Sequence, residues 1–405
     1  MNTPTQQYRT PAVVVGMNLG GLGVVRSLSA AGIPVIAVHD DDQNPEMSTR
    51  HAMRKVVLPI RTEALVEGLL QLARELPERP VLIATLRLPL LVISEHRARL
   101  AEAYRFTLPP HQAVVDAENK EALMQLVAKT GLQLPRTLLL QDDVALDAAR
   151  DLRFPVIVKP ADNDIGYMQR FEKAYILDDM DALTALAHAV WPHYRNLVLQ
   201  EWLPGGDEAL YYCLQYRSPA GERRASFVGR KLYSWPPGKG ATAACTAATE
   251  HVQAVESFAD AFLGGLELTG FVSIELKRDP RDGAFYMIEP TVGRTDQQEE
   301  IATLNGVNLP AIGYCDLLGL PLPPLEPAAR PQTWFNRITT GRAQKQLRAR
   351  GAPLPSLRVN GGRAHDAYFR TGDPLPGILS YLGLVPRIER PLRSSVGFLR
   401  RLAMR

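Results

Sequence analysis

Several features that mark secreted, membrane-spanning or metal-clustered proteins are missing from this sequence. Only three cysteines occur in 405 residues; they are widely separated and match no metal-ligand spacing. An odd number of such cysteines suits a reducing compartment. The longest apolar runs, 81–84 and 88–93, are far shorter than the roughly 20 residues that cross a bilayer. Residues 1–10 are polar and lack the apolar core of a signal peptide, so we expect a cytoplasmic protein without a transmembrane segment.

Other absences exclude further classes. A net charge of +3 is small for this length, so nucleic-acid binding has no support at the level of the whole chain. The histidines are scattered without metal-ligand spacing. Neither a G-x-x-x-x-G-K-[ST] loop nor a G-x-S-x-G elbow occurs, which disfavours P-loop enzymes and hydrolases. Residues 387–405 are the local exception, because arginines alternate there with apolar residues. This pattern predicts either a terminal helix that docks one apolar face or weak peripheral contact with an anionic membrane or polymer.

The N-terminal part of the sequence has a strand–helix–strand pattern. A β-branched run at 12–16 ends in a glycine-rich turn, helical spacing follows from Gly23, and a second β-branched run occupies 33–38. Strand-like and helix-like patterns continue to alternate as far as residue 84. We therefore expect a parallel sheet covered by helices in a first, Rossmann-like domain at 1–115.

The middle of the chain mixes both kinds of element in a second domain, at 116–320. Helical patterns lie at 116–128, 250–266, 299–304 and 310–318, and extended patterns at 134–140, 152–160, 196–200, 210–216, 224–232, 270–277 and 284–289. The residues Asp279-Pro-Arg-Asp-Gly give a strong hairpin turn signal. A proline-rich linker opens a C-terminal extension at 321–405, whose weak patterns predict either substrate contacts or the interface of a homodimer. The fold class is therefore α/β, with an α+β second domain.

The clearest chemical signal is a pair of carboxylates, Glu275 and Glu289, one on each side of the predicted hairpin. Each interrupts a mainly apolar strand. Paired strands around a tight turn can direct two carboxylates into one cleft, where a divalent cation offsets their repulsion. Exposed edge residues are the alternative interpretation of this local pattern.

Upstream residues favour phosphate and nucleotide binding. Lys159 ends a buried-looking strand, where an ammonium can contact a polyphosphate as a point charge. The apolar run that ends at Leu203 is followed by a turn and by Glu208, an arrangement that suits an adenine edge and a ribose. Lys239 lies within Trp235-Pro-Pro-Gly-Lys-Gly, a loop that we expect to be flexible enough to close over phosphates.

In this order and spacing the motifs resemble the ATP-grasp superfamily, as in D-alanine–D-alanine ligase and biotin carboxylase. The resemblance covers residues 12–320 and implies a pre-ATP-grasp first domain, ATP and Mg²⁺ as cofactors, and carboxylate and amine substrates. It also implies the following roles: Lys120, Lys159 and Lys231 for the ATP phosphates, Glu201 and Leu203 for adenine through the backbone, Glu208 with Asp207 as a competitor for the ribose, and Glu275 and Glu289 for Mg²⁺.

One position departs from the family pattern. An asparagine usually stands two residues after the second metal-binding glutamate, and this chain has Thr291 there. A hydroxyl is a neutral ligand of shorter reach, so the number of bound metal ions, one or two, stays open. Arg294 follows and is expected to stabilise phosphoryl or acyl-phosphate oxygens. Residues 296–298 (Asp-Gln-Gln) are expected to face the amine or carboxylate substrate.

Two alternatives remain at this stage. The glycine-rich turn at 16–23 follows a strand, and Asp40 and Asp41 come about 20 residues later, as in a dinucleotide fold. Read from Gly16, however, the G-x-G-x-x-G spacing places Asn18 at its second glycine. An NAD(P)-dependent oxidoreductase is therefore the first alternative, and a non-catalytic nucleotide-binding protein is the second. The main prediction is an ADP-forming ligase that makes an amide bond through an acyl phosphate.

Overall fold

The computed structural model describes residues 8–162 and 164–383, which form two compact units. Their described residues are 8–115, 206–276 and 289–383 in unit 1, and 116–162, 164–205 and 277–288 in unit 2. Both units combine segments that are distant in sequence, so the division into 1–115, 116–320 and 321–405 stays a prediction. The basic segment 387–405 lies outside the described residues.

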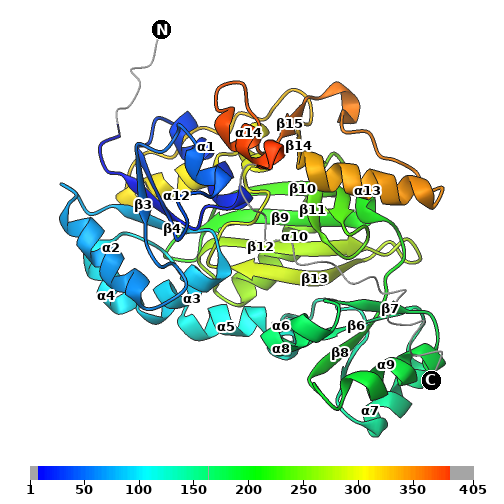
Figure 1. Cartoon of the computed structure of the whole chain (residues 1–405). Coiled ribbons are helices and arrows are strands. Elements are labelled where there is room, and N and C mark those ends of the chain that lie inside the picture. The colour runs from blue at the N-terminus through cyan, green and yellow to red at the C-terminus, as the bar shows by residue number, and fades with distance from the viewer. Residues whose placement is uncertain (1–7, 163, 384–405) are drawn as a thin grey trace. The chain divides into compact units, whose positions relative to one another are not determined.

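The first part of unit 1 is a four-stranded parallel sheet in the order β3-β2-β1-β4 (Figure 1). Its elements are β1 (Ala12–Val15), α1 (Leu19–Ala30), β2 (Val35–His39), η1 (Pro45–Ser48), β3 (Arg54–Val57), α2 (Ala64–Arg74), β4 (Val81–Ala84), α3 (Arg87–Glu95), α4 (Arg97–Ala103) and α5 (His111–Glu118). Alternate residues of β1 pack on opposite sides: Val14 joins the core beneath α1, and Val13 joins the core beneath α2 to α4. The parallel sheet covered by helices that the sequence predicts is therefore present.

A seven-stranded sheet in the order β13-β12-β9-β10-β11-β14-β15 carries most of the remaining residues of interest. Its strands are β9 (Leu210–Arg217), β10 (Arg223–Trp235), β11 (Ala241–Ala247), β12 (Gly270–Arg278), β13 (Phe285–Val292), β14 (Thr333–Phe335) and β15 (Ala364–Asp366). Strand β11 was not predicted. It pairs antiparallel with β10, and its five central residues are buried.

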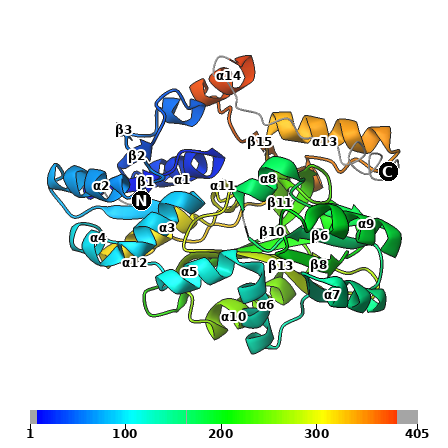
Figure 2. The ribbon, with the colours of Figure 1, turned by 60° about the horizontal axis from the view of Figure 1, so that its bottom comes forward.

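The other elements of unit 1 are α10 (Val252–Gly265), α11 (Glu300–Leu304), α12 (Leu309–Leu318), α13 (Arg337–Ala349), α14 (Leu375–Leu382), η3 (Asp207–Ala209) and η4 (Val359–Gly361). One apolar core joins α1 and β1 to the large sheet, through Tyr212 and Tyr216 of β9 and Trp334 of β14. Figure 2 shows the same elements after rotation of the view. Trp334 belongs to this core, and the described residues after it, up to residue 383, are part of unit 1.

A buried carboxylate fastens the C-terminal region to the N-terminal sheet within unit 1. Asp373 accepts hydrogen bonds from Arg26 Nε at 3.0 Å, Thr49 Oγ1 at 2.8 Å and the Arg50 amide at 3.0 Å. Arg26 also donates to the carbonyl oxygen of Ala367 at 2.7 Å. These contacts fix the chain immediately before α14, which packs on η1.

Unit 2 is built on a four-stranded antiparallel sheet in the order β5-β8-β6-β7. Its elements are α6 (Lys120–Thr130), β5 (Thr137–Leu140), α7 (Asp143–Ala148), η2 (Ala149–Asp151), β6 (Val156–Pro160), α8 (Ile165–Arg170), β7 (Tyr175–Leu177), α9 (Met180–Val190) and β8 (Leu197–Glu201). Asn119 caps α6 by accepting hydrogen bonds from the amides of Glu121 and Ala122, and Gly131 ends the helix in the left-handed region. These features explain where the helix begins and ends.

Candidate active site

A buried ion pair lies on the large sheet of unit 1. The Nζ atom of Lys231, on β10, is 2.5 Å from Oε2 of Glu275, on β12. Strand β9 lies between these two strands, so the side chains meet across it. Only 5% of the Lys231 side chain and 16% of the Glu275 side chain are exposed. The structure thus joins a predicted phosphate ligand to a predicted metal ligand.

Two further carboxylates act on this pair. Burial lowers the pKa of Lys231, but Glu275, Glu289 and Asp296 outweigh it and raise that pKa overall. Burial raises the pKa of Glu275; Lys231 opposes this shift, and Glu289 adds to it. Three carboxylates therefore share one ammonium, and the cluster has an excess of negative charge that a bound cation would offset. We call these four residues the acid–lysine cluster.

Asp296 belongs to this cluster, although the sequence suggested only that it faces a substrate. Its Oδ2 accepts hydrogen bonds from Ser273 Oγ at 3.0 Å and from Gln298 Nε2 at 3.3 Å, and its Oδ1 accepts one from the Gln297 amide at 3.0 Å. Ser273 lies two residues before Glu275 on the same strand, so both side chains are on one face of the sheet. The alternation of polar residues along β12 is the signal that could have linked them.

Mg²⁺ suits the donors in this cluster. Glu289 is exposed on β13, next to β12, and Thr291 follows on the same face of β13, where it is buried. Within residues 8–162 and 164–383, no group of three or more histidine, cysteine, aspartate or glutamate residues is arranged to hold a metal ion. Mg²⁺ commonly uses only one or two carboxylates together with phosphate oxygens, so Glu275 and Glu289 would be sufficient protein ligands.

Arg294 lies in the turn that follows β13. Gly293 adopts a positive φ of 77° there, a conformation that favours glycine. The Arg294 side chain is half-buried, and its Nη1 donates to the Thr295 carbonyl oxygen at 3.4 Å. Arg294 therefore precedes Asp296, a member of the acid–lysine cluster, by two residues in the sequence.

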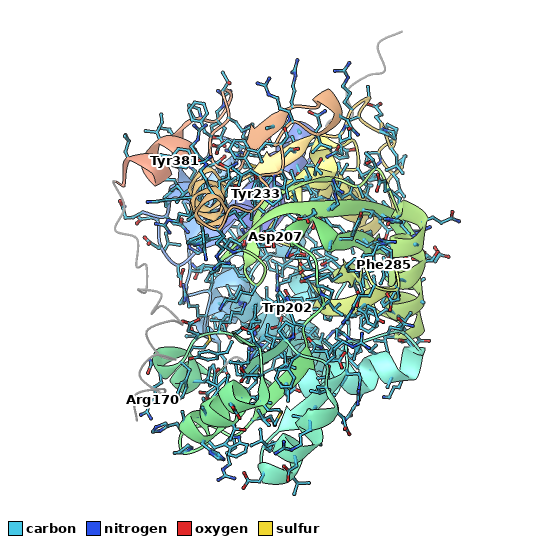
Figure 3. The ribbon with its side chains drawn as sticks, turned by 90° about the vertical axis from the view of Figure 1, so that its right-hand side faces the viewer. Arg170, Trp202, Asp207, Tyr233, Phe285 and Tyr381 are labelled. Carbon is cyan, nitrogen blue, oxygen red and sulfur yellow. The ribbon has the colours of Figure 1, made fainter. Side chains whose placement is uncertain are left out.

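The loop that contains Lys239 is a tight turn joining β10 to β11. Asp207 is buried, and each of its carboxylate oxygens accepts a hydrogen bond from the backbone at this turn. The donors are the Ser234 amide at 2.7 Å and the Gly238 amide at 2.9 Å. Figure 3 shows Asp207 near Tyr233, the residue before Ser234. The turn is thus anchored by a carboxylate at its base, which the expectation of a freely flexible loop did not include. Lys239 itself is half-buried.

The two predicted ribose ligands have different surroundings. Asp207 uses both oxygens on the turn, whereas its neighbour Glu208 is exposed. A ribose ligand must offer carboxylate oxygens to hydroxyl groups, and those of Glu208 are accessible. Glu208 is therefore the better candidate.

In unit 2, the predicted phosphate-binding lysines lie at one end of β6. Lys159 is on this strand, and its Nζ donates to Gln200 Oε1 on β8 at 3.3 Å. Lys120 begins α6, and its backbone amide donates to the carbonyl oxygen of Ala161 at 3.0 Å. Because Ala161 lies two residues after Lys159, this bond brings the start of α6 to the end of the strand.

The predicted adenine segment of unit 2 is held by a residue of β12, Lys277, to which the sequence analysis assigned no role. The buried Nζ of Lys277 donates to the carbonyl oxygens of Leu203 at 2.8 Å and Gly205 at 3.0 Å, and lies 4.6 Å from the ring centroid of Trp202. Glu201 Oε1 accepts a hydrogen bond from the Arg153 amide at 2.8 Å. These bonds fix the backbone of the segment after β8. A lysine within the apolar strand pattern of β12 was the available signal.

Comparisons with known proteins show what this chain is similar to. No protein-family profile matches the sequence. A D-aspartate ligase of Enterococcus faecium (strain Aus0004) is 23% identical over 313 residues, which are 73% of this chain and 74% of that protein.

Three solved structures share the fold. An N5-carboxyaminoimidazole ribonucleotide synthetase in complex with ADP aligns with a TM-score of 0.64 and 15% identity, over 84% of this chain and 86% of that one. The biotin carboxylase domain of the Hydrogenobacter thermophilus 2-oxoglutarate carboxylase was solved with MgADP, ADP and bicarbonate. It aligns with a TM-score of 0.59 and 13% identity, over 79% of this chain and 72% of that one. An L-amino acid ligase from Bacillus licheniformis aligns with a TM-score of 0.57 and 17% identity, over 77% of this chain and 75% of that one.

All these proteins are ATP-grasp enzymes, so the predicted resemblance to that superfamily is confirmed, and the similarity favours a ligase over the oxidoreductase and the non-catalytic alternative. The fold is a mixed α/β fold that matches theirs. The chain therefore has the fold of these ATP-grasp enzymes and resembles a D-aspartate ligase in sequence.

Proposed function

We propose that this enzyme joins a small-molecule carboxylate to an amine through an acyl phosphate, and converts ATP to ADP and phosphate. The observation that carries the proposal is the acid–lysine cluster of unit 1. Phosphoryl transfer depends mainly on positioning and on neutralising charge, not on a dedicated protein nucleophile. A buried ammonium surrounded by carboxylates that suit Mg²⁺ supplies the groups that this chemistry requires.

The same proposal assigns the nucleotide contacts. Lys120 and Lys159 contact ATP phosphates, which is supported by their positions at the end of β6. The backbone of Glu201 and Leu203 contacts adenine, and Lys277 and the Arg153 amide hold this segment in place.

Three further assignments concern unit 1. Glu208 binds the ribose because its carboxylate is exposed, and Asp207 keeps its structural role at the turn. Lys239 contacts phosphates from that turn. In domain terms, residues 1–115 form a Rossmann-like pre-ATP-grasp domain and the C-terminal region extends the large sheet.

Glu275 and Glu289 would hold Mg²⁺, with the Thr291 hydroxyl as a further donor. Mg²⁺ held there would supply positive charge that offsets the negative charge of the transferred phosphoryl group. Lys231 contributes its ammonium to the same phosphates, and Arg294 offers a planar guanidinium to the phosphoryl or acyl-phosphate oxygens.

The proposed reaction has two steps. A carboxylate oxygen of the substrate attacks the γ-phosphorus of ATP, the bond from that phosphorus to the β–γ bridging oxygen breaks, and ADP leaves. The amine nitrogen then attacks the acyl carbon, phosphate leaves with the electrons of its bond, and the nitrogen loses a proton. Exclusion of water protects the acyl phosphate between the steps.

Amino acids are the first substrates to test. The curated relative is a D-aspartate ligase and one structural neighbour is an L-amino acid ligase. Both names describe enzymes that act on amino acids, which are carboxylates and amines at once. D-aspartate and the L-amino acids, offered singly and in pairs, therefore form the first screen for ADP formation.

The test of the function uses Glu289→Gln, which keeps the size of the side chain but removes its charge. We expect substrate-dependent ADP release to be lost, by 10²-fold or more, an order of magnitude typical for removal of one catalytic electrostatic group. Glu326→Gln, at an exposed glutamate in a loop, is the matched control and should leave the rate unchanged. Normal ADP release by Glu289→Gln would refute the metal assignment, and absence of ADP release from wild-type enzyme with every pair would refute the reaction.

We further propose a cytoplasmic location. The three cysteines are buried and unbridged, which suits a reducing compartment. No helix in the described part of the chain has both the length and the apolar character needed to span a membrane.

A further inference from the structure

Positive charge is concentrated at the C-terminal end of the chain. Residues 327–405 contain fifteen lysines and arginines but only three aspartates and glutamates, a net charge of +12. The whole chain has a net charge of +3, so residues 1–326 carry −9. Such asymmetry between two parts of a chain is typical of proteins that bind an anionic surface. The small overall charge conceals it.

Part of this charge lies on a helix of unit 1. Helix α13 and the residue after it contain five basic residues and no acidic one: Arg337, Arg342, Lys345, Arg348 and Arg350. All five are exposed, whereas the helix buries Thr340 and Ala343. The outward side of α13 is therefore cationic.

Helix α14 reverses the usual arrangement of a surface helix. It buries Pro376, Gly377 and Ser380. Its large apolar residues face outward instead: Leu375 is 51% exposed, Ile378 38% and Leu382 66%. These three residues are spaced three and four apart and form one stripe along the helix. A surface helix normally turns such a stripe toward the core.

The two helices are held together within unit 1. The Arg337 guanidinium lies over the ring of Tyr381, 5.6 Å from its centroid, and its Nε donates to Asp366 Oδ2 at 2.9 Å. The Tyr381 hydroxyl donates to the other oxygen of Asp366. Figures 1 and 2 both show α14 beside α13, and Figure 3 places Tyr381 at the edge of the molecule. Arg337 and Tyr381 thus join the helix that carries the cations to the helix that carries the apolar stripe, and we call the exposed residues of both helices the C-terminal surface.

We propose that this C-terminal surface binds anionic lipid membranes. The lysine and arginine side chains contact the headgroups, and Leu375, Ile378 and Leu382 enter the boundary between headgroups and acyl chains. Both features are required, because cations alone give weak and salt-sensitive attraction and an apolar stripe alone gives no preference for anionic lipid. The cytoplasmic leaflet is the anionic one, which agrees with the proposed location.

Other partners fit the surface less well. A nucleic acid would use the cations but has no place for an aliphatic stripe, since its backbone is contacted through charge. A second copy of the chain would place cations against cations, and like charges across an interface oppose association. The sequence at 387–405 continues the same combination, with six arginines, one glutamate and interleaved apolar residues.

The experiment measures co-sedimentation of the full chain with vesicles. We expect binding to phosphatidylcholine vesicles that contain phosphatidylglycerol, and little binding to phosphatidylcholine alone or at high salt. Neutralising α13 with R342Q, K345Q and R348Q together should lower the partition roughly 100-fold, because each cation near an anionic surface contributes about fivefold. Replacing the stripe with L375N, I378N and L382N should lower it roughly tenfold or more.

Matched variants control for general changes of charge and apolarity. R54Q, R61Q and R99Q remove three exposed arginines from the N-terminal part of unit 1, and V144N removes an exposed apolar side chain from unit 2. Both should leave vesicle binding unchanged. A chain that ends at residue 383 should bind more weakly but remain sensitive to the α13 and α14 variants. Thermal unfolding checks that every variant folds.

The following results would overturn the proposal. They are failure of the full chain to bind anionic vesicles, binding that survives both triple variants, and complete loss of binding on removal of 384–405. Preferential binding to DNA over vesicles would also overturn it, as would a dimer in solution that the stripe variant dissociates.

Discussion

Lys231 offers the sharpest test of how the acid–lysine cluster is held together. The change Lys231→Met keeps a side chain of similar length but removes the ammonium that lies 2.5 Å from Glu275 Oε2. Three carboxylates, those of Glu275, Glu289 and Asp296, then remain close together without a cation. Glu275→Gln removes one carboxylate instead and leaves the ammonium with the other two. The two variants should therefore lose different amounts of the free energy of unfolding.

The magnitude follows from the geometry. At 2.5 Å and an effective dielectric constant of about 20, the attraction between two unit charges is about 7 kcal/mol. Much of this is offset by the loss of hydration of the buried groups, so removal of one partner typically costs about 3–5 kcal/mol. We expect Lys231→Met to lower the free energy of unfolding by an amount in that range. Glu275→Gln should lower it by about 1–3 kcal/mol, because the Lys231 ammonium keeps its other partners.

Urea unfolding in Mg²⁺-free buffer, followed by tryptophan fluorescence, measures these losses. The double variant Lys231→Met/Glu275→Gln should be more stable than the sum of the single changes predicts, with a coupling energy of about 2–3 kcal/mol. Mg²⁺ added without nucleotide should stabilise Lys231→Met more than wild type, because the competing ammonium is gone. Equal losses for the two single variants and additivity within about 0.5 kcal/mol would refute the description of the cluster as a buried pair with excess negative charge.

Three further predictions concern other parts of the chain. Lys159→Ala should raise the KM for ATP about tenfold or more in steady-state ADP release, because we propose that its ammonium contacts a phosphate of ATP; an unchanged KM would contradict that role. Asp207→Asn should mobilise the turn that carries Lys239, because the two backbone donors use different oxygens and the NH2 group that replaces one of them cannot accept; limited proteolysis should then cut near Gly238. Asp373→Asn should cost about 3–5 kcal/mol at neutral pH in urea unfolding, because it leaves Arg26 partly uncompensated. Burial raises the pKa of Asp373, but its hydrogen bonds lower it more, so the wild-type advantage should disappear as the pH falls below about 4.

The sequence predicted elements best where one local signal decided the structure. The hairpin of β12 and β13 was predicted correctly because Asp279-Pro-Arg-Asp-Gly strongly favours a turn. The helix predicted at 116–128 is correct only in part: Gly131 ends α6 as expected, but Asn119 caps its start, so residues 116–118 belong to α5. The first sheet followed from alternating patterns and short turns. In each case the information lies within a few residues of the element it specifies.

Elements that depend on distant partners were missed. Strand β11 consists of alanine, threonine and one cysteine, a composition with little intrinsic preference for strands. It forms because β10 and β14 pair with its two edges and because Trp334 and its neighbours bury its side chains. No window of the sequence centred on β11 contains that information.

The candidate site shows the same division. Glu275 and Glu289 were found because a strong turn separates them, whereas the structural roles of Lys277 and Asp207 appeared only in three dimensions. Both hold backbone through hydrogen bonds to segments that are distant in sequence or loop-like. Polar residues of this kind have the same appearance in a sequence as polar residues that contact a ligand.

The excess charge of the acid–lysine cluster bears on the departure at Thr291. Counted as ionised, the three carboxylates and the one ammonium carry two excess negative charges, which a single divalent ion would balance. Asp296 already uses its oxygens on Ser273, Gln297 and Gln298, so it contributes charge rather than a free ligand. A second ion would therefore depend on phosphate oxygens and on the Thr291 hydroxyl, a weaker ligand than a carboxylate. We therefore predict one tightly held ion, with any further one brought by the nucleotide.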